Sequence, residues 1–274
     1  MDMPVDPEKL FTQSDSVPQE LAPQTPPPLA PRKVWTWRDL LLFLAFLPFA
    51  FLASKLIVLT GYAALRPLLG WHARAESAQF DTIFLLIQQC VLYGFILVFL
   101  FLLSRFQHRT AFWKSLGWEK PTIRQAAGYL VGGITLAVAA SLVLWLLPDS
   151  QSFPLEKLFD SRLASFALSA FAISLAPLLE EVFFRGLLFA VVENAAGWPL
   201  AAVTSAVLFG ALHAPEYWQA WHHLMMIFAV GMVFSLARGL TGSLVPSVLL
   251  HIGYNSLIVA SLFFSSQYFR ALNG

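Results

Sequence analysis

Seven long apolar segments dominate the sequence and restrict what the chain can fold into. A membrane-spanning helix needs about 20 consecutive, mostly apolar residues. The segments cover residues 39–60, 82–104, 125–147, 164–190, 199–214, 222–238 and 244–266, and the first runs apolar to Leu69, far enough to hide an eighth helix. Only 12% of the residues are charged, about half the share usual in soluble domains. The sequence therefore predicts an all-α, polytopic transmembrane helical bundle of seven or eight spans.

Composition divides the chain into three regions. Residues 1–37 are rich in proline, as in TPPPLAP, and lack an apolar face, so we expect a disordered tail, inert or else bound by a polyproline reader. Residues 38–120 hold the first two spans and a basic loop, and residues 121–268 hold the other five spans. The net charge of +1 does not favour nucleic acid as a partner, and the lone Cys90 excludes an intrachain disulfide and a cysteine-based metal site.

The distribution of basic residues predicts the orientation of the bundle. The loop between the second and third spans contains five of them: Arg105, Arg109, Lys114, Lys120 and Arg124. The next long connection, residues 148–162, is net acidic. Because cytoplasmic loops carry an excess of Lys and Arg, the basic loop is predicted to face the cytoplasm, and the short connections at 194–197 and 238–243 then lie on the same side.

Three charged residues interrupt the fourth apolar segment, in the stretch EEVFFRG at 180–186. A charge near the bilayer centre costs about 2.5–3.5 kcal/mol on insertion scales, so Glu180, Glu181 and Arg185 are expected to face the interior of the bundle. Glu181 and Arg185 have the i,i+4 spacing of a helical ion pair. Glu180 lies about 100° further round the helix and is left free to act as a general base.

Polar residues in two later spans can reach the same depth as Glu180. It lies 17 residues before Gly197, and His213 lies 16 residues after it, so a tight antiparallel turn brings the two level, roughly 20–25 Å from the turn. In the last span His251 and Asn255 share one helix face, at roughly 15 Å from the preceding turn. We therefore predict that these four side chains converge on one internal cavity.

The polar residues resemble the motifs of a known family. EEVFFR fits EExxxR, FGALH fits FxxxH and HIGYN fits HxxxN, in that order and each within a span. The pattern is similar to that of the CPBP intramembrane proteases, which include Rce1-like type II CAAX prenyl endopeptidases and bacterial ABI-type homologues, over residues 120–265. The resemblance implies a metal-independent glutamic peptidase without a cofactor, which cleaves a membrane-associated peptide or protein. We expect the protein in the bacterial inner (plasma) membrane, with the site open to the cytoplasmic side on which the basic loop is predicted to lie.

The resemblance further implies a role for each motif residue. Glu180 and His213 would activate a water, and His251 and Asn255 would stabilise the oxyanion. Three neighbouring residues would support them: Glu181 and Arg185 as an ion pair, and Phe209 by packing.

Other interpretations of the same residues remain open. Glu180, His213 and His251 could together hold zinc and a water, although the sequence contains no HExxH motif. The same scaffold could also serve a non-proteolytic membrane binding or immunity factor, or a transporter with a proton-relay carboxylate.

Several further residues carry weaker signals. Gly128 and Gly132 form a GxxxG pattern, which weakly indicates close helix packing. His222 and His223 begin a span beside two tryptophans and are interpreted as part of an interfacial belt. His108 lies in a loop, as does His72, and neither is assigned a role.

Overall fold

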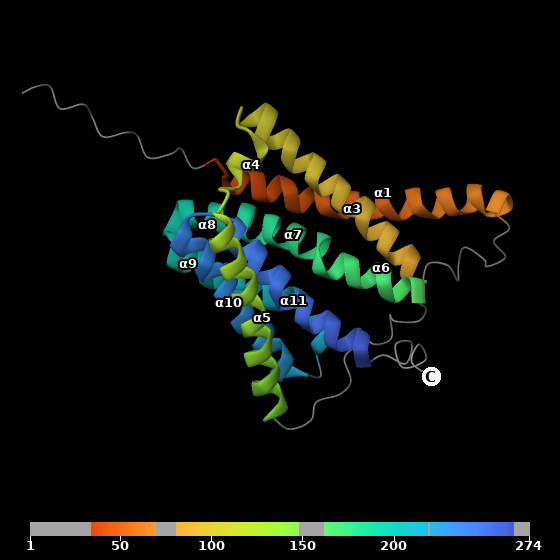
Figure 1. Ribbon diagram of the computed structural model, residues 1–274. Coiled ribbons are helices and arrows are strands. Elements are labelled where there is room, and N and C mark those ends of the chain that lie inside the picture. The colour runs from red at the N-terminus through yellow and green to blue at the C-terminus, as the bar shows by residue number, and fades with distance from the viewer. Residues whose placement is uncertain (1–33, 70–80, 148–161, 219, 266–274) are drawn as a thin grey trace, which may run out of the picture. The chain divides into compact units, whose positions relative to one another are not determined.

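Helices make up every element of the computed structural model, which describes residues 34–69, 81–147, 162–218 and 220–265 (Figure 1). Seven helical segments among these residues are long and apolar enough to cross a membrane: Trp37–Leu68, Thr82–Gln107, Ile123–Trp145, Leu163–Ala196, Trp198–Tyr217, Trp221–Thr241 and Val245–Phe264. The predicted all-α polytopic bundle is thus confirmed, and the chain is a multi-pass integral membrane protein.

The first apolar segment forms one helix rather than two. Helix α1 (Trp37–Leu69) runs without a break through 33 residues, so the described residues hold seven spans and the possible eighth is not among them. At 1.5 Å per residue it is about 50 Å long, longer than the roughly 30 Å hydrocarbon core, and such a helix tilts or extends beyond that core. The predicted tail up to residue 33, the acidic connection at 148–161 and His72 lie outside the described residues.

The remaining elements follow α1 along the chain. They are α3 (Thr82–Leu102), η2 (Leu103–Gln107), α4 (Phe112–Ser115), α5 (Ile123–Trp145), α6 (Arg162–Ile173), α7 (Leu175–Glu181), η4 (Val182–Leu188), α8 (Phe189–Ala196), α9 (Trp198–Tyr217), α10 (Trp221–Thr241) and α11 (Val245–Ser265). The two η elements are π-helical turns. The α5 helix begins at a capping box, in which the side chains of Thr122 and Gln125 each bond the other's backbone N–H, and this fixes its first turn.

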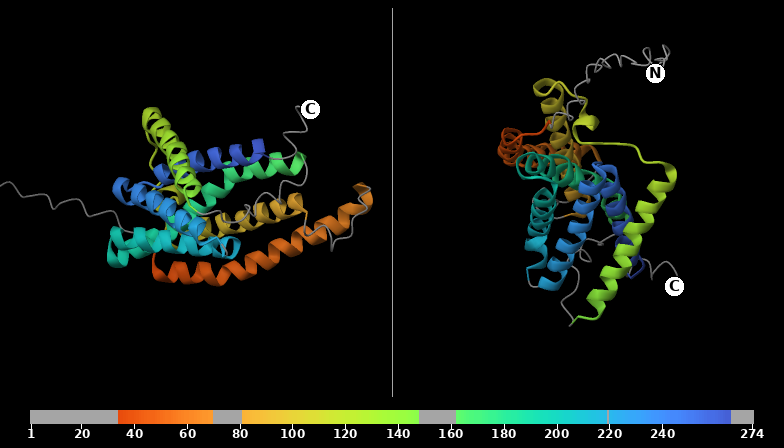
Figure 2. Two further views of the ribbon diagram at one scale, coloured as in Figure 1. Left: turned by 90° about the horizontal axis from the view of Figure 1, so that it is seen from below. Right: turned by 90° about the vertical axis from the view of Figure 1, so that its left-hand side faces the viewer.

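The segment from α6 to α8 lies at the centre of the helix packing. On one side α6 packs against α3, which in turn packs against α1. On the other side α6 and α7 pack against α11, and α8 packs against α9. Helices α10 and α5 complete the neighbourhood of α11 (Figures 1 and 2). The charged residues of the fourth span are therefore enclosed by other helices, as their cost in lipid requires.

Glycines bring α5 and α11 into backbone contact. A Cβ added to Gly133 would lie 2.1 Å from the carbonyl oxygen of Leu250, and one added to Gly253 would lie 2.2 Å from that of Leu130. The GxxxG prediction was therefore wrong for Gly128, which has nothing within 4 Å of an added Cβ. Small residues permit such close approach in membrane helices, and the contact fixes the part of α11 on which the site residues lie.

A buried aspartate joins the start of α1 to the end of η2. Asp39 is fully buried, and its Oδ2 accepts hydrogen bonds from the backbone N–H and the hydroxyl of Thr36, at 2.8 and 2.7 Å. Its Oδ1 accepts from Gln107 at 2.7 Å and lies 3.0 Å from His108 Nε2. His108, which received no role from the sequence, thus helps to satisfy a buried carboxylate.

Long-range hydrogen bonds place several connections at one end of the bundle. The indole of Trp35 donates to Ser115 O at 2.8 Å, and Asn194 Nδ2 donates to Trp35 O at 2.6 Å. Leu244 N donates to Gly117 O at 2.9 Å. The connections at 194–197 and 238–243 therefore lie on the same side as the basic loop, as predicted; which side of the membrane this is remains a prediction.

Candidate active site

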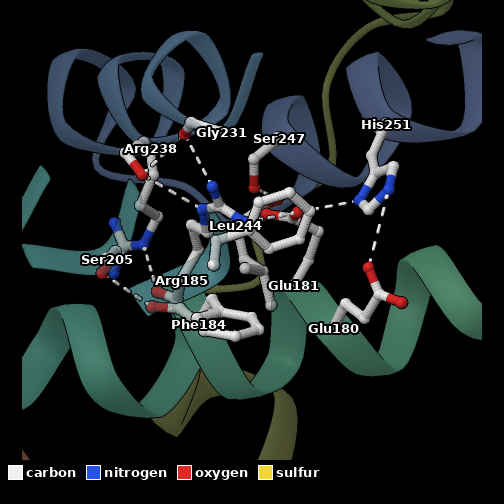
Figure 3. A network of polar contacts seen from close by, with 12 residues as sticks. Glu180, Glu181, Phe184, Arg185, Ser205, Gly231, Arg238, Leu244, Ser247 and His251 are labelled. Carbon is white, nitrogen blue, oxygen red and sulfur yellow. Dashed lines mark hydrogen bonds and ion pairs between the residues drawn. The ribbon is translucent and has the colours of Figure 1, made fainter. Parts of the chain in front are cut away.

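The predicted ion pair on the fourth span is present. Arg185 Nη1 lies 2.9 Å from Glu181 Oε1, and both side chains are fully buried (Figure 3). Arg185 also donates from Nε to the hydroxyl of Ser235 at 3.1 Å and from Nη2 to the carbonyl of Gly231 at 2.6 Å. Its guanidinium lies 4.7 Å from the ring centre of Phe209. These partners, two of them on α10, offset the desolvation of the buried charges.

The helix that carries this pair is irregular at two places: it is interrupted seven residues before Glu181, and it becomes π-helical directly after Glu181. Ser174 separates α6 from α7, with φ −117° and ψ −72°, and Pro177, one turn later, has no N–H with which to bond the carbonyl of residue 173. Beyond Glu181 the chain forms the π-helical turn η4, in which Phe189 N–H bonds to the carbonyl of Phe184, five residues earlier. π-Helical turns of this kind are frequent at functional sites.

His251 of α11 connects the two adjacent glutamates. Its Nδ1 lies 2.9 Å from Glu181 Oε1, and its Nε2 lies 3.7 Å from Glu180 Oε2 (Figure 3). Because Glu181 is paired with Arg185 and its oxygen accepts, the hydrogen of this contact is on Nδ1. The imidazole is 4% exposed and stacks on Phe234 at 4.8 Å between ring centres, so its orientation is fixed.

Glu180 and Glu181 have unequal environments. The side chain of Glu181 is fully buried, whereas that of Glu180 is 24% exposed. The 3.7 Å separation between Glu180 and His251 is too long for a direct hydrogen bond. One carboxylate is thus fixed by the fold, and the other has oxygen lone pairs available at a partly open position.

His213 lies beside the site on α9, next to the phenylalanine of its motif. Its Nδ1 is 2.8 Å from Phe209 O, and because a carbonyl can only accept, Nδ1 donates and Nε2 of the neutral ring is an acceptor. The Phe209 ring centre lies 4.8 Å from that of His213 and 5.8 Å from that of His251. Phe209 therefore packs against both imidazoles.

Asn255, one turn beyond His251, contacts α6, the helix that precedes the one carrying the glutamates. Its Nδ2 donates to the carbonyl of Ala172 at 2.8 Å, just before the break at Ser174. This bond uses one of the two amide hydrogens. The second N–H and the side-chain oxygen have no hydrogen-bond partner within the described part of the chain. Asn255 thus ties α11 to α6 and still has a donor for another group.

Two residues that sequence reasoning missed bind the carbonyls of η4. Ser205 donates to Phe184 O at 3.0 Å, and Arg238 donates from Nε to Arg185 O at 3.1 Å. The sequence places Arg238 in the short connection at 238–243, but α10 extends through Thr241 and buries Arg238 to 7% exposure. Small hydroxyl side chains within apolar spans were the available signal for Ser205 and for Ser235.

A metal site is not formed by these side chains. Within the part of the chain that the structure describes, no three or more His, Cys, Asp or Glu side chains are grouped so that they could hold a metal ion. The set that the zinc alternative would use, Glu180 with His213 and His251, is therefore not arranged as ligands of one ion.

Comparisons with known proteins agree with the motifs. Residues 162–257 match the family model described as type II CAAX prenyl endopeptidase Rce1-like. An Escherichia coli protein described as an uncharacterized 24.3 kDa protein is 33% identical over 137 residues, which cover 47% of this chain and 61%, less than two thirds, of that protein. No solved structure matches the chain. The matched region contains all three motifs, from Glu180 to Asn255, and over this region the chain is similar to the Rce1-like family.

Proposed function

We propose that the protein is an intramembrane endopeptidase that hydrolyses peptide bonds of membrane-associated substrates with a water activated by Glu180. The observation that carries the proposal is the unequal environment of the two glutamates. Glu181 is bound by Arg185 and His251 and holds the helices together. Glu180 is partly exposed, and its one ion-pair neighbour among the described residues is His251. A carboxylate in such a position can accept a proton from a water.

The proposed first step is attack by this water on the scissile carbonyl. Glu180 takes one proton from the water as the new C–O bond forms, and His213 orients the water through its Nε2 lone pair. The tetrahedral intermediate then collapses, the C–N bond breaks, and Glu180 returns the proton to the leaving amine. The proton that Glu180 takes from the water is the one that it gives to the leaving amine, so these steps require no metal or cofactor.

The oxyanion of the intermediate would be stabilised by His251 and Asn255. Asn255 has its second amide hydrogen for this purpose. His251 already donates from Nδ1 to Glu181, so a further bond from Nε2 requires the imidazolium form. Donors fixed in this way before the reaction stabilise developing charge without reorganisation.

The similarity to Rce1-like proteins and the seven spans support a proposal for the class of substrate and for the location. Rce1-like proteins are membrane proteases, so we infer a membrane-associated peptide or protein as the substrate of this chain. The side of the bundle that carries the basic loop would face the cytoplasm of a bacterial inner membrane, and the site would open towards that side.

A substrate-trapping experiment tests the proposed activity. The membrane peptidome of cells that express the wild type is compared with that of cells that express Glu180→Gln, which keeps the shape of the side chain but removes the base. Cleavage products should disappear, and the turnover of purified protein should fall by at least about 100-fold. The control is Glu216→Gln, the same change at an exposed glutamate of α9.

The alternatives predict other outcomes of the same experiment. Identical peptidomes for wild type and Glu180→Gln would favour a binding or immunity factor. Proton-coupled uptake that is lost with Glu180→Gln, without any cleavage, would favour a transporter. Activity that a chelator removes and zinc restores would favour the zinc peptidase.

A further inference from the structure

Arg238 is a buried cation that the proposed mechanism does not use. It lies in the last turn of α10 and is 7% exposed. Its Nε donates to Arg185 O at 3.1 Å, and its guanidinium carbon lies 5.4 Å from the ring centre of Phe189. The carboxylates of Glu193 and Glu119 lie near enough to offset part of the cost of desolvating this charge. Among the described residues, the hydrogen bond that the guanidinium donates to another helix goes to the carbonyl of Arg185, and the choice of this carbonyl requires an explanation.

The carbonyl that Arg238 binds is the one that distinguishes a π-helix from an α-helix at this point. In an α-helix Phe189 N–H would bond to the carbonyl four residues earlier, that of Arg185. In η4 it bonds instead to the carbonyl of Phe184. In the π-helical form Phe189 N–H is therefore not bonded to Arg185 O, and Arg238 donates a hydrogen bond to this carbonyl instead.

Ser205 provides a contrast at the neighbouring carbonyl. Its hydroxyl donates to Phe184 O at 3.0 Å, an oxygen that already accepts the N–H of Phe189. Loss of Ser205 would leave Phe184 O with a partner, whereas loss of Arg238 would leave Arg185 O without its side-chain donor in a buried position. The two side chains are thus not equivalent in what they stabilise.

A change of register in η4 would reach the glutamates. A π-helical turn accommodates one extra residue, so reversion to an α-helix would shift the chain before it by one residue, a rotation of about 100° about the helix axis. Glu180 and Glu181 directly precede η4, while α8 after it is packed against α9. The rotation would therefore displace Glu180 from its position opposite His251.

We propose that Arg238 is a positioning residue that holds η4 in π-helical form and thereby sets the orientation of Glu180. The role in catalysis rests on the proposed function, but the effect on η4 does not. Arg238 also connects η4 to the basic loop: a Cβ added to Gly117, whose φ is +71°, would lie 3.0 Å from its Nη2. The geometry of the site is thus coupled to the loop at that end of the bundle.

The first test measures kinetics on three purified variants. Arg238→Met should lower kcat by about 100-fold and change KM by less than about threefold, because displacement of a reacting group affects the chemical step. Ser205→Ala should lower kcat by less than about threefold, and Arg238→Lys, which can still donate, should recover part of the loss. Arg124→Met, the same change at an exposed arginine of α5, is the matched control. A kcat for Arg238→Met equal to that of the control would overturn the proposal.

The second test does not depend on activity. Amide hydrogen exchange of the detergent-solubilised protein should become at least about tenfold faster in residues 182–190 of Arg238→Met, since the segment then opens as it samples two registers. Exchange in α9 should remain as in the wild type. Unchanged exchange in 182–190, or equal acceleration in every helix, would overturn the inference. If exchange changes as expected but the wild type cleaves nothing, the proposed function fails and the role of Arg238 in η4 stands.

Discussion

Replacement of Arg185 by methionine tests the central ion pair of the fourth span. The change removes donors to Glu181, to Ser235 and to Gly231 O, all within 3.1 Å, and leaves the fully buried carboxylate of Glu181 without its cation. Breaking a buried pair from one side costs roughly 3–5 kcal/mol. For a protein of this size that corresponds to a fall in Tm of about 6–20 °C, measured by thermal unfolding in detergent.

The double variant separates the charge from the packing. When Glu181→Gln is combined with Arg185→Met, no buried charge is left unpaired, so the double variant should be more stable than Arg185→Met alone, with a coupling of about 0.5–3 kcal/mol. Helical content by circular dichroism should match the wild type in both. An unchanged Tm for Arg185→Met, or a double variant that loses the sum of the two single effects, would refute the reasoning.

Four further results are expected. Asn255→Ala should slow turnover by about 100–1,000-fold with little change in substrate binding, as for the loss of one oxyanion donor. The chelator phenanthroline should leave the activity of purified protein unchanged, and recovery of a lost activity by zinc would contradict this. Lys114→Cys should resist labelling by an impermeant reagent applied outside the cell, whereas efficient labelling would reverse the orientation. Gly253→Ala should lower stability by about 1–3 kcal/mol because its Cβ meets Leu130 O, and Gly128→Ala, with open space around it, should raise it by up to about 1 kcal/mol.

The spans were predictable from the sequence because hydropathy and length define a transmembrane helix almost alone. The predicted segments agree with the helices to within a few residues at most boundaries. The first differs because its apolar run continues to Leu69 as one helix. The Glu181–Arg185 pair was predictable for the same kind of reason, since it depends only on local helical spacing.

The features of the site that could not be predicted from the sequence depend on contacts between segments far apart in the chain. The break at Ser174 and the π-helical turn η4 are satisfied by side chains from α9, α10 and α11, which a single helix does not specify. The place of His251 between two carboxylates likewise requires the crossing of α11 and α7. The close approach to α11 is made by Gly133, opposite Gly253, and not by Gly128 of the GxxxG pattern. Which residues of a helix meet its neighbour depends on where and at what angle the two helices cross, and the sequence of one helix does not specify this.

The backbone contact between α5 and α11 limits which segments can be transplanted into a chimera with a related protein. Helix α5 precedes the matched residues 162–257, yet it supplies the carbonyl of Leu130 and the glycine that meet α11 most closely. Trp35, further upstream still, binds Asn194 at the turn between α8 and α9. A chimera that transplants residues 162–257 alone would separate α11 from the surface that sets its depth. A transferable unit therefore has to begin before the region that the family model matches and has to include α5 and Trp35.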